Sequence, residues 1–334
     1  MELNGYSTLL REMDWPGSSA QRRVSPTGLR NDELSHHLAE LRERLAGSGT
    51  AGPALPWVLD HLRHVQWHYT AISDEAGLAA HLRWAGQANA VVVVGDTVIN
   101  PAGEVLVGPG AGAGDVPVLP EALTRAQRVR QELAAHDVMV PPGALPVRST
   151  AEVTLRRPDQ IAKRAVALVV SADFALSVLD GAPLDSEFMA RTFPRSFAER
   201  TPTEVALFRT RDPAVAARLK WGYEAAAQLL AMCGRVEPTF PRDFADQGQV
   251  WNSSVGIEEP LLLRSLELLP VVEVCDAWEG ARALHHTVST ARAEHLHPPA
   301  ELDPDIVSQR YQAMEWLTGD QEWDEVVTEV PCTA

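Results

Sequence analysis

A run of helix signals that fills the chain after residue 146 constrains its fold more than any other feature. Residues 158–179 place apolar side chains at three- and four-residue steps, the spacing of one buried helix face. Residues 201–204, Thr-Pro-Thr-Glu, form a capping box with proline at the first helical position. We therefore expect a mostly α-helical domain in the second half of the chain. Further helices are predicted over 212–233, 258–269 and 271–296.

The last predicted helix is marked at both ends. Asp303 can cap the first amides, and Pro304 fits the first helical position. Gly319 is a natural stop, and Trp323-Asp324 then opens a short acidic tail. Side chains at helical spacing lie between these ends: Ile306 or Val307, Arg310, Met314 and Leu317.

The N-terminal part predicts a small unit that mixes strands and helices. Residues 1–29 are polar and interrupted by proline and glycine, so we expect an arm with at most a short helix. An amphipathic helix over 31–45 and a linker over 47–56 follow. A β-α-β-β unit comes next, with these elements: helix 57–65, strand 66–72, helix 74–88, and strands 90–94 and 104–107 of a hairpin.

Two joints rich in glycine and proline divide the chain, one over 108–120 and one over 140–146. The predicted fold class is therefore α+β, a small β-α-β-β N-terminal unit followed by a mostly α-helical domain. We expect three parts: an arm and helix over 1–56, the small α/β unit over 57–110, and the helical domain over 120–330.

Composition bounds the partners and the compartment. The chain has 334 residues and a formal charge of −16, so nucleic acid and anionic lipid are poor partners. The three cysteines lack CxxC or zinc spacing, which favours a reducing cytoplasm, with Cys233 and Cys275 as buried side chains. The N-terminus lacks signal-peptide features, and the longest apolar run near a strand, 90–94, is too short to span a bilayer. Lysine is almost absent beside arginine, which indicates a GC-rich bacterial genome.

Several motifs in the second half resemble an uncharacterised bacterial family, domain of unknown function 4272. The matching residues near the C-terminus are Arg310, Ala313, Trp316, Trp323 and Asp324. Residues 220–225, Lys-Trp-Gly-Tyr-Glu-Ala, are similar to the family's central motif, and the segment from the second joint to residue 158 is similar to its opening. The resemblance covers about 120–330 and implies a fold without a reaction. It departs at Arg292, which lacks the His-Trp that the family usually carries four residues before this arginine.

Glu224 is the strongest candidate for chemistry, because it lies one turn after Trp221 on a predicted helix. A buried glutamate beside an indole could act as an acid or base. The structural alternative is an ion pair with Lys220 one turn back or with Arg310. We predict that Glu224 and Arg310 form a partly buried pair that ties two helices together.

Other patterns that could bind a metal or a cofactor are weak. The first histidine cluster lacks a matching carboxylate, and its helix should end before the last histidine. The second lies at a helix end beside two prolines. The glycine-rich run 108–115 lacks the GK[ST] ending of a phosphate loop. We therefore expect no metal and no cofactor. The two clusters are His61, His64 and His68, and His285, His286, His295 and His297.

The tryptophans favour a binding function. Trp251 and Trp323 fall in predicted loops or tails, where an indole covers a groove or meets a partner. We predict a non-catalytic binding or protein-interaction module, with a protein partner or a second copy of the chain as its target. The alternative is a hydrolase-like enzyme with a site around Glu224, Arg292 and Arg310. The candidate binding residues are Trp221, Glu224, Arg292, Arg310, Trp316, Trp323 and Asp324.

Overall fold

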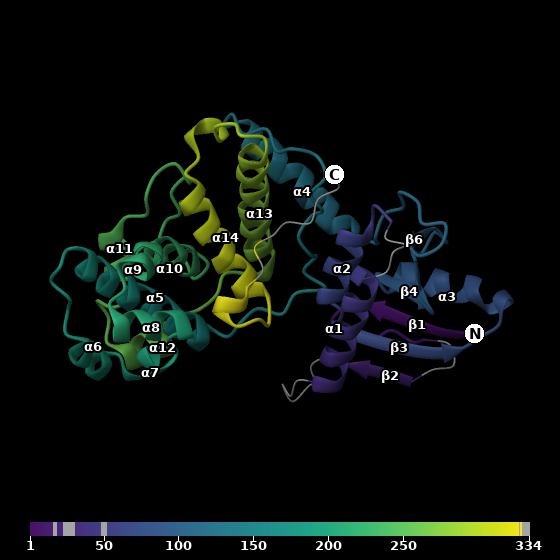
Figure 1. Ribbon diagram of the computed structural model, residues 1–334, viewed down its shortest axis with the longest axis horizontal. Coiled ribbons are helices and arrows are strands. Elements are labelled where there is room, and N and C mark those ends of the chain that lie inside the picture. The colour runs from purple at the N-terminus through teal and green to yellow at the C-terminus, as the bar shows by residue number, and fades with distance from the viewer. Residues whose placement is uncertain (16–18, 23–30, 48–51, 327, 329–334) are drawn as a thin grey trace. The chain divides into compact units, whose positions relative to one another are not determined.

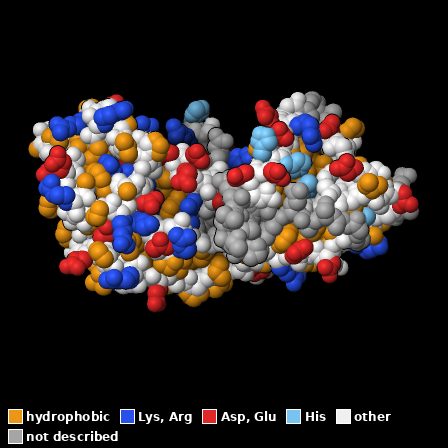
Figure 2. All heavy atoms as spheres, turned by 90° about the horizontal axis from the view of Figure 1, so that it is seen from below, with side chains coloured by type: hydrophobic (Ala, Val, Ile, Leu, Met, Phe, Trp, Pro, Cys, Tyr) orange, Lys and Arg blue, Asp and Glu red, His pale blue; other side chains and the backbone are white. Residues whose placement is uncertain are grey.

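The computed structural model describes residues 1–15, 19–22, 31–47, 52–326 and 328, and it has an α+β architecture (Figure 1). The described chain forms two compact units. The sheet unit comprises residues within 1–126 and 142–153, and the helical unit comprises residues within 127–141 and 154–328. Hydrophobic, basic and acidic side chains are interspersed on the face that Figure 2 displays.

An antiparallel sheet organises the first unit. Its strands lie in the order β2-β3-β1-β4-β5-β6. The first strand pairs with β3 on one side and with β4 on the other, so it lies inside the sheet and not at an edge. The strands are β1 (Glu2–Ser7), β2 (Ser19–Arg22), β3 (Trp67–Ile72), β4 (Ala90–Val94), β5 (Thr97–Ile99) and β6 (Val105–Val107).

The prediction that residues 1–29 are an arm with at most a short helix is therefore wrong for its described part. Strand β1 has six residues, and two of them, Asn4 and Gly5, are poor strand formers. Long-range pairing with β3 and β4 compensates, and Gly5 allows close packing: a Cβ there would lie 2.5 Å from the Trp15 ring and 2.9 Å from the Trp84 ring. Residues 16–18 and 23–30 of the predicted arm lie outside the described residues.

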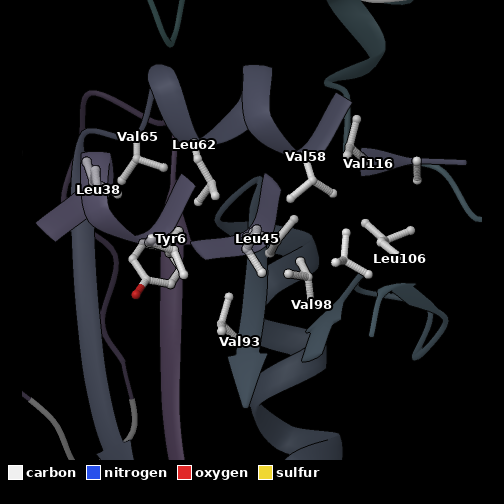
Figure 3. Close-up of a cluster of buried hydrophobic side chains, with 14 of the residues drawn as sticks. Tyr6, Leu38, Leu45, Val58, Leu62, Val65, Val93, Val98, Leu106 and Val116 are labelled. Atoms are coloured by element: carbon white, nitrogen blue, oxygen red, sulfur yellow. The ribbon is translucent and has the colours of Figure 1, made fainter. Parts of the chain in front are cut away.

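Side chains from β1 and β4 alternate between two cores, one on each face of the sheet. On one face, Tyr6 and Val93 pack against α1 (Asp32–Gly47) and α2 (Leu55–Arg63), as Figure 3 shows. The stripe predicted for the first helix is confirmed, because its leucines are all buried there: Leu34, Leu38, Leu41 and Leu45.

On the other face, α3 (Glu75–Gln87) covers an aromatic core. Trp15 meets Trp84 edge to face at 4.2 Å between ring centroids, and Tyr69 meets Trp84 in the same way at 4.9 Å. Asp74 caps this helix by accepting a hydrogen bond from the Gly77 amide, as the sequence predicted. With both faces covered by helices, the sheet carries apolar side chains on both sides.

Packing divides the chain differently from the three predicted ranges. Residues within 1–56 and 57–110 share one unit, because β1 lies between β3 and β4 and α1 covers the same sheet. Segment 142–153 also belongs to this unit. Its Glu152 is buried and accepts hydrogen bonds from the Thr8 hydroxyl at 2.5 Å and the Asn89 amide at 2.8 Å.

Helices make up nearly all of the second unit. The central one, α5 (Pro158–Leu179), has the bounds that the sequence predicted and contacts α7, α8, α9, α10 and α12. Helix α10 packs between α5 and α14, and α14 packs on α13. The helices that follow the sheet are α4 (Pro120–Ala134), α5, α6 (Ser186–Thr192), α7 (Pro194–Ala198), α8 (Pro202–Thr210), α9 (Pro213–Leu219), α10 (Gly222–Ala231), α11 (Gln247–Asn252), α12 (Glu259–Ser265), α13 (Val271–Ala293) and α14 (Pro304–Thr318), with short 3-10 turns η1 (Pro299–Glu301) and η2 (Trp323–Glu325).

Helix ends follow the sequence signals closely. The predicted capping box of α8 is confirmed: Thr201 accepts from the Glu204 amide at 3.2 Å, and Glu204 accepts from the Thr201 amide at 2.8 Å. Asp303 caps α14, which ends before Gly319. Within the described residues, no helix has the length and apolar character needed to span a membrane.

The single helix predicted over 212–233 is wrong, because the chain turns at Lys220 and Trp221 between α9 and α10. The next residue, Gly222, lies against α5: a Cβ there would be 2.9 Å from the Leu168 carbonyl oxygen. This close contact between two backbones sets where α10 begins. The hydrophobic periodicity of the sequence does not reveal it.

Candidate binding site

Glu224 and Arg310 form the predicted ion pair between α10 and α14. Arg310 donates from Nε at 3.1 Å and from Nη2 at 2.7 Å to one carboxylate oxygen of Glu224. The other oxygen accepts from the Ala245 amide at 2.9 Å. Arg310 also donates to the Thr239 hydroxyl at 2.9 Å and to the Asp243 carbonyl at 3.3 Å. Both charged side chains are buried, so the pair clamps the loop over 239–245 onto two helices.

Of the other two predicted residues of this region, Trp221 adjoins the pair and Arg292 does not. Trp221 is half-buried at the start of α10, where it stacks on Phe244 at 5.9 Å and lies under the Lys220 ammonium at 5.3 Å. Arg292 is exposed in the last turn of α13. The arrangement therefore does not join Arg292 to the buried Glu224 and Arg310.

A cavity of about 430 Å³ lies elsewhere in the helical unit, at the start of α5, and we call it the Arg–Trp cavity. The α7–α8 connection, the end of α14 and the turn η2 form its other walls. This volume is in the range of small-ligand sites. Five cationic side chains, four acidic ones and two indoles line it: Arg156, Arg157, Lys163, Arg164, Arg200, Glu199, Glu322, Asp324, Glu325, Trp316 and Trp323.

Two arginines of this cavity stack on its two indoles. The Arg156 guanidinium lies 4.3 Å from the Trp316 ring centroid, and that of Arg164 lies 5.0 Å from the Trp323 ring centroid. The indoles meet edge to face at 5.6 Å. Arg156 is further fixed by donating to the carbonyls of Trp316, at 2.7 Å, and of Gln321. These contacts hold the cations in place before any ligand arrives.

A buried ion pair lies behind one wall of the cavity. Arg164 is 4% exposed and pairs with Glu204, which is 1% exposed. Glu204 also caps α8 through its second oxygen, so the pair ties α5 to the start of α8. Burial lowers the pKa of Arg156 and of Arg200, and nearby carboxylates act against that shift.

The Arg200 guanidinium is stacked on two phenylalanine rings. Its guanidinium lies 3.3 Å from the Phe197 ring centroid and 4.5 Å from that of Phe208. Its Nε donates to the Phe197 carbonyl at 2.7 Å. Among the described residues its two terminal nitrogens have no hydrogen-bond acceptor, so they are available to an anion at the cavity wall.

The acidic turn after α14 forms one side of the cavity. Trp323 is 7% exposed, and its carbonyl accepts from the Gln312 amide at 3.2 Å. Asp324 accepts from the Thr203 amide at 3.0 Å, at the N-terminus of α8. A second cavity of about 210 Å³ adjoins the same two residues, so the turn borders both spaces.

Three of the seven predicted binding residues are therefore brought together: Trp316, Trp323 and Asp324. The sequence did not indicate Lys163, Arg164 or Arg200 as site residues, and Arg156 falls in the segment before residue 158 that resembles the family's opening. One feature of the sequence pointed to Arg164, because this charged residue lies among the mostly apolar buried residues of α5. The partner indole on η2 lies more than a hundred residues away in the chain, so no local pattern reveals the pairing.

Trp251 does not lie in a loop as predicted. It is on α11, where it is 45% exposed. Cys233 and Cys275 are buried as predicted, and burial raises the pKa of Cys233 to about 12. A thiol with that pKa is a poor nucleophile at neutral pH.

The first histidine cluster is divided between two elements. His61 on α2 contacts the Tyr6 carbonyl at 3.0 Å, while His68 on β3 stacks on the Tyr6 ring at 4.8 Å and contacts Asn4 at 2.9 Å. In the second cluster, His285 stacks on Tyr311 at 4.5 Å. Among the described residues, no group of three His, Cys, Asp or Glu side chains is placed to hold a metal ion.

Comparison with known proteins identifies the helical unit. The family model described as a domain of unknown function (DUF4272) matches residues 125–326, which include every wall of the Arg–Trp cavity. No curated protein and no solved structure matches the chain. Since the family model spans more than half of the sequence, the chain belongs to the DUF4272 family.

Proposed function

We propose that the chain is a non-catalytic protein-interaction module that binds an acidic segment of a partner in the Arg–Trp cavity. The convergence of stacked arginines and two indoles on one cavity carries this proposal. Guanidinium groups bind carboxylates through charge-assisted hydrogen bonds, and arginine and tryptophan are the side chains most enriched in binding hot spots. The residues that line the cavity include no cysteine, histidine or serine, and the hydroxyl of their one threonine, Thr201, caps α8, which favours binding over nucleophilic chemistry.

Local charge supports an acidic ligand although the whole chain is acidic. Residues 154–220 carry 11 lysines and arginines against 8 acidic residues, within a chain of formal charge −16. The basic walls of the cavity all come from this segment. Distant charges are screened at physiological salt, so an approaching carboxylate responds mainly to the side chains that line the cavity, five of them cationic and four acidic.

The enzyme alternative around Glu224, Arg292 and Arg310 has less support. Each carboxylate oxygen of Glu224 has a hydrogen-bond donor from the protein, and Arg310 is bound to Glu224 and to the adjacent loop. Neither of them lines the Arg–Trp cavity, and Arg292 is exposed on another helix. Buried ion pairs of this kind hold elements in register without taking part in a reaction.

The proposed setting is the bacterial cytoplasm. The buried Cys233 and Cys275, in a sequence without CxxC spacing, suit a reducing compartment. Fractionation of the native host should recover the chain with cytoplasmic markers. The partner can be another protein or a second copy of the chain, and sedimentation of the purified protein separates these two possibilities.

A labelled oligoglutamate peptide tests acid recognition. We expect it to bind the parent protein and to lose at least tenfold in affinity when Arg200→Met or Lys163→Met removes a charge while keeping an apolar stem. Arg209→Met, on the exposed face of α8 and outside the cavity, is the matched control. Binding should weaken as salt rises, because local attraction is screened. Equal affinity for all variants, or binding that strengthens with salt, would contradict the proposal.

A further inference from the structure

The turn η2 occupies a place that an external ligand could take. Its Trp323 indole lies against Trp316 and under the Arg164 guanidinium, and its Asp324 carboxylate accepts a hydrogen bond from the first turn of α8. These are an aromatic group and an acidic group, side by side in sequence, each bound by a complementary group of the helical unit.

The spaces beside the turn extend this site. The Arg–Trp cavity of about 430 Å³ and the second cavity of about 210 Å³ both include Trp323 and Asp324 in their walls. The second cavity is lined further by polar side chains of two helices, Gln309 and Gln312 of α14 and Arg218 of α9. The turn therefore borders both cavities, which together with the turn's own place we call the groove, and each cavity gives room for a longer chain segment.

We propose that this groove is a peptide site for an acidic segment that contains tryptophan, and that the chain's own residues 322–325 fill it in cis. The proposal rests on the protein-interaction function above and names the chemistry of the partner. The partner segment would place its indole between Trp316 and Arg164 and a following carboxylate at the Thr203 amide, in place of Trp323 and Asp324.

The turn is attached in a way that permits exchange. It is a single 3-10 turn of three residues, and one indole and one carboxylate provide its side-chain anchors. Local opening of this turn breaks these contacts and the hydrogen bond from Gln312 to the Trp323 carbonyl, and it leaves the helices of the unit in place. When the turn occupies the groove, it competes with an external peptide as a tethered ligand whose effective concentration is ~1 mM or more. Binding of a partner is thus limited by the chain itself.

A labelled peptide with the sequence of residues 319–326 tests the exchange against the full chain. We expect weak binding to the parent protein and at least tenfold tighter binding to the Trp323→Ala/Asp324→Ala double variant. The same peptide with alanine in place of tryptophan should not bind the double variant. Trp251→Ala, which removes an exposed tryptophan of the same unit, is the matched control and should bind as the parent does.

Melting curves accompany each measurement, because Trp323 is buried and its loss can unfold the domain. Asp324→Ala alone changes an exposed side chain and removes only the contact with α8. This single variant should therefore bind the peptide more tightly than the parent does, but less tightly than the double variant. Equal affinity for the parent and for both variants would overturn the inference.

The oligoglutamate peptide, measured on the same samples, separates the two proposals. Oligoglutamate binding can depend on Arg200 while the tryptophan peptide binds the parent and the turn variants equally. That result would support recognition of acidic segments and would contradict occupation of the groove by residues 322–325. If neither peptide binds any folded variant, both proposals fall.

Discussion

Arg310 directs its guanidinium at one carboxylate and at one loop, and this makes it a structural residue. Removal of either charge of a buried pair leaves the other without compensation, which costs on the order of 3–5 kcal/mol. Glu224→Gln or Arg310→Met should therefore lower the melting temperature strongly, and the double variant should recover part of the loss. Chemical denaturation of the four proteins measures the coupling. Additive losses would contradict a direct pair.

His285 predicts a pH dependence of stability in the helical unit. Burial lowers its pKa to about 4, with help from the charges of His286 and Arg282. The folded-state pKa lies below the unfolded value of about 6.5, so the unfolded chain binds the proton first. The contribution to stability is present above pH ~6.5 and is lost as pH falls toward ~4, by about 1.4 kcal/mol for each pKa unit.

A histidine variant checks this window. His285→Phe keeps a ring against Tyr311 and removes the titrating group, so its melting temperature should fall less than that of the parent between about pH 7 and pH 4. His297→Phe, at an exposed position, should keep the parent slope. Identical slopes for the parent and His285→Phe would mean that other groups cause the dependence.

At the scale of elements, two glycines in helices should respond in opposite ways to alanine. In α10, a Cβ at Gly222 would lie 2.9 Å from a backbone oxygen of α5, so Gly222→Ala forces the helices apart and should cost about 1–3 kcal/mol. In α13, nothing lies within 4 Å of a Cβ at Gly280. Gly280→Ala should therefore stabilise the helix by up to about 1 kcal/mol. A destabilised Gly280→Ala beside an unaffected Gly222→Ala would contradict this packing.

The sequence predicted the elements whose signals are local. The caps and periodicity of α5, α8 and α14 are properties of neighbouring residues, and these helices have the expected starts. Strand β1 was missed because its partners, β3 and β4, lie far along the chain, and the break before α10 was missed because it depends on a contact with α5. Contacts between residues far apart in the chain decide the local structure in both cases.

The candidate site follows the same rule. The indoles of Trp316 and Trp323 were found through the family motif near the C-terminus. Their arginine partners come from the other end of the domain: Arg156 and Trp316 are 160 residues apart. Residue type marks a tryptophan as a candidate, but only the packing of α5 on the end of the chain decides which arginine stacks on it.

At the scale of the whole molecule, the joint over 108–120 should be cut without separating the sheet unit. Residues 109–115 are largely exposed, so limited proteolysis should begin there. Val116 is buried in the core beneath α2, and the unit continues to residue 126 and resumes over 142–153. The nicked protein should therefore elute as one species in native size exclusion and give two fragments on a denaturing gel. Elution as two species would show that the joint alone connects independent parts.

A crystal structure of the Trp323→Ala/Asp324→Ala protein with the peptide of residues 319–326 would show whether the peptide takes the place of the turn. We expect the peptide indole against Trp316 and its following carboxylate at the Thr203 amide, next to the arginines of the cavity. A peptide bound on another face, or a groove that stays empty at saturating peptide, would contradict it.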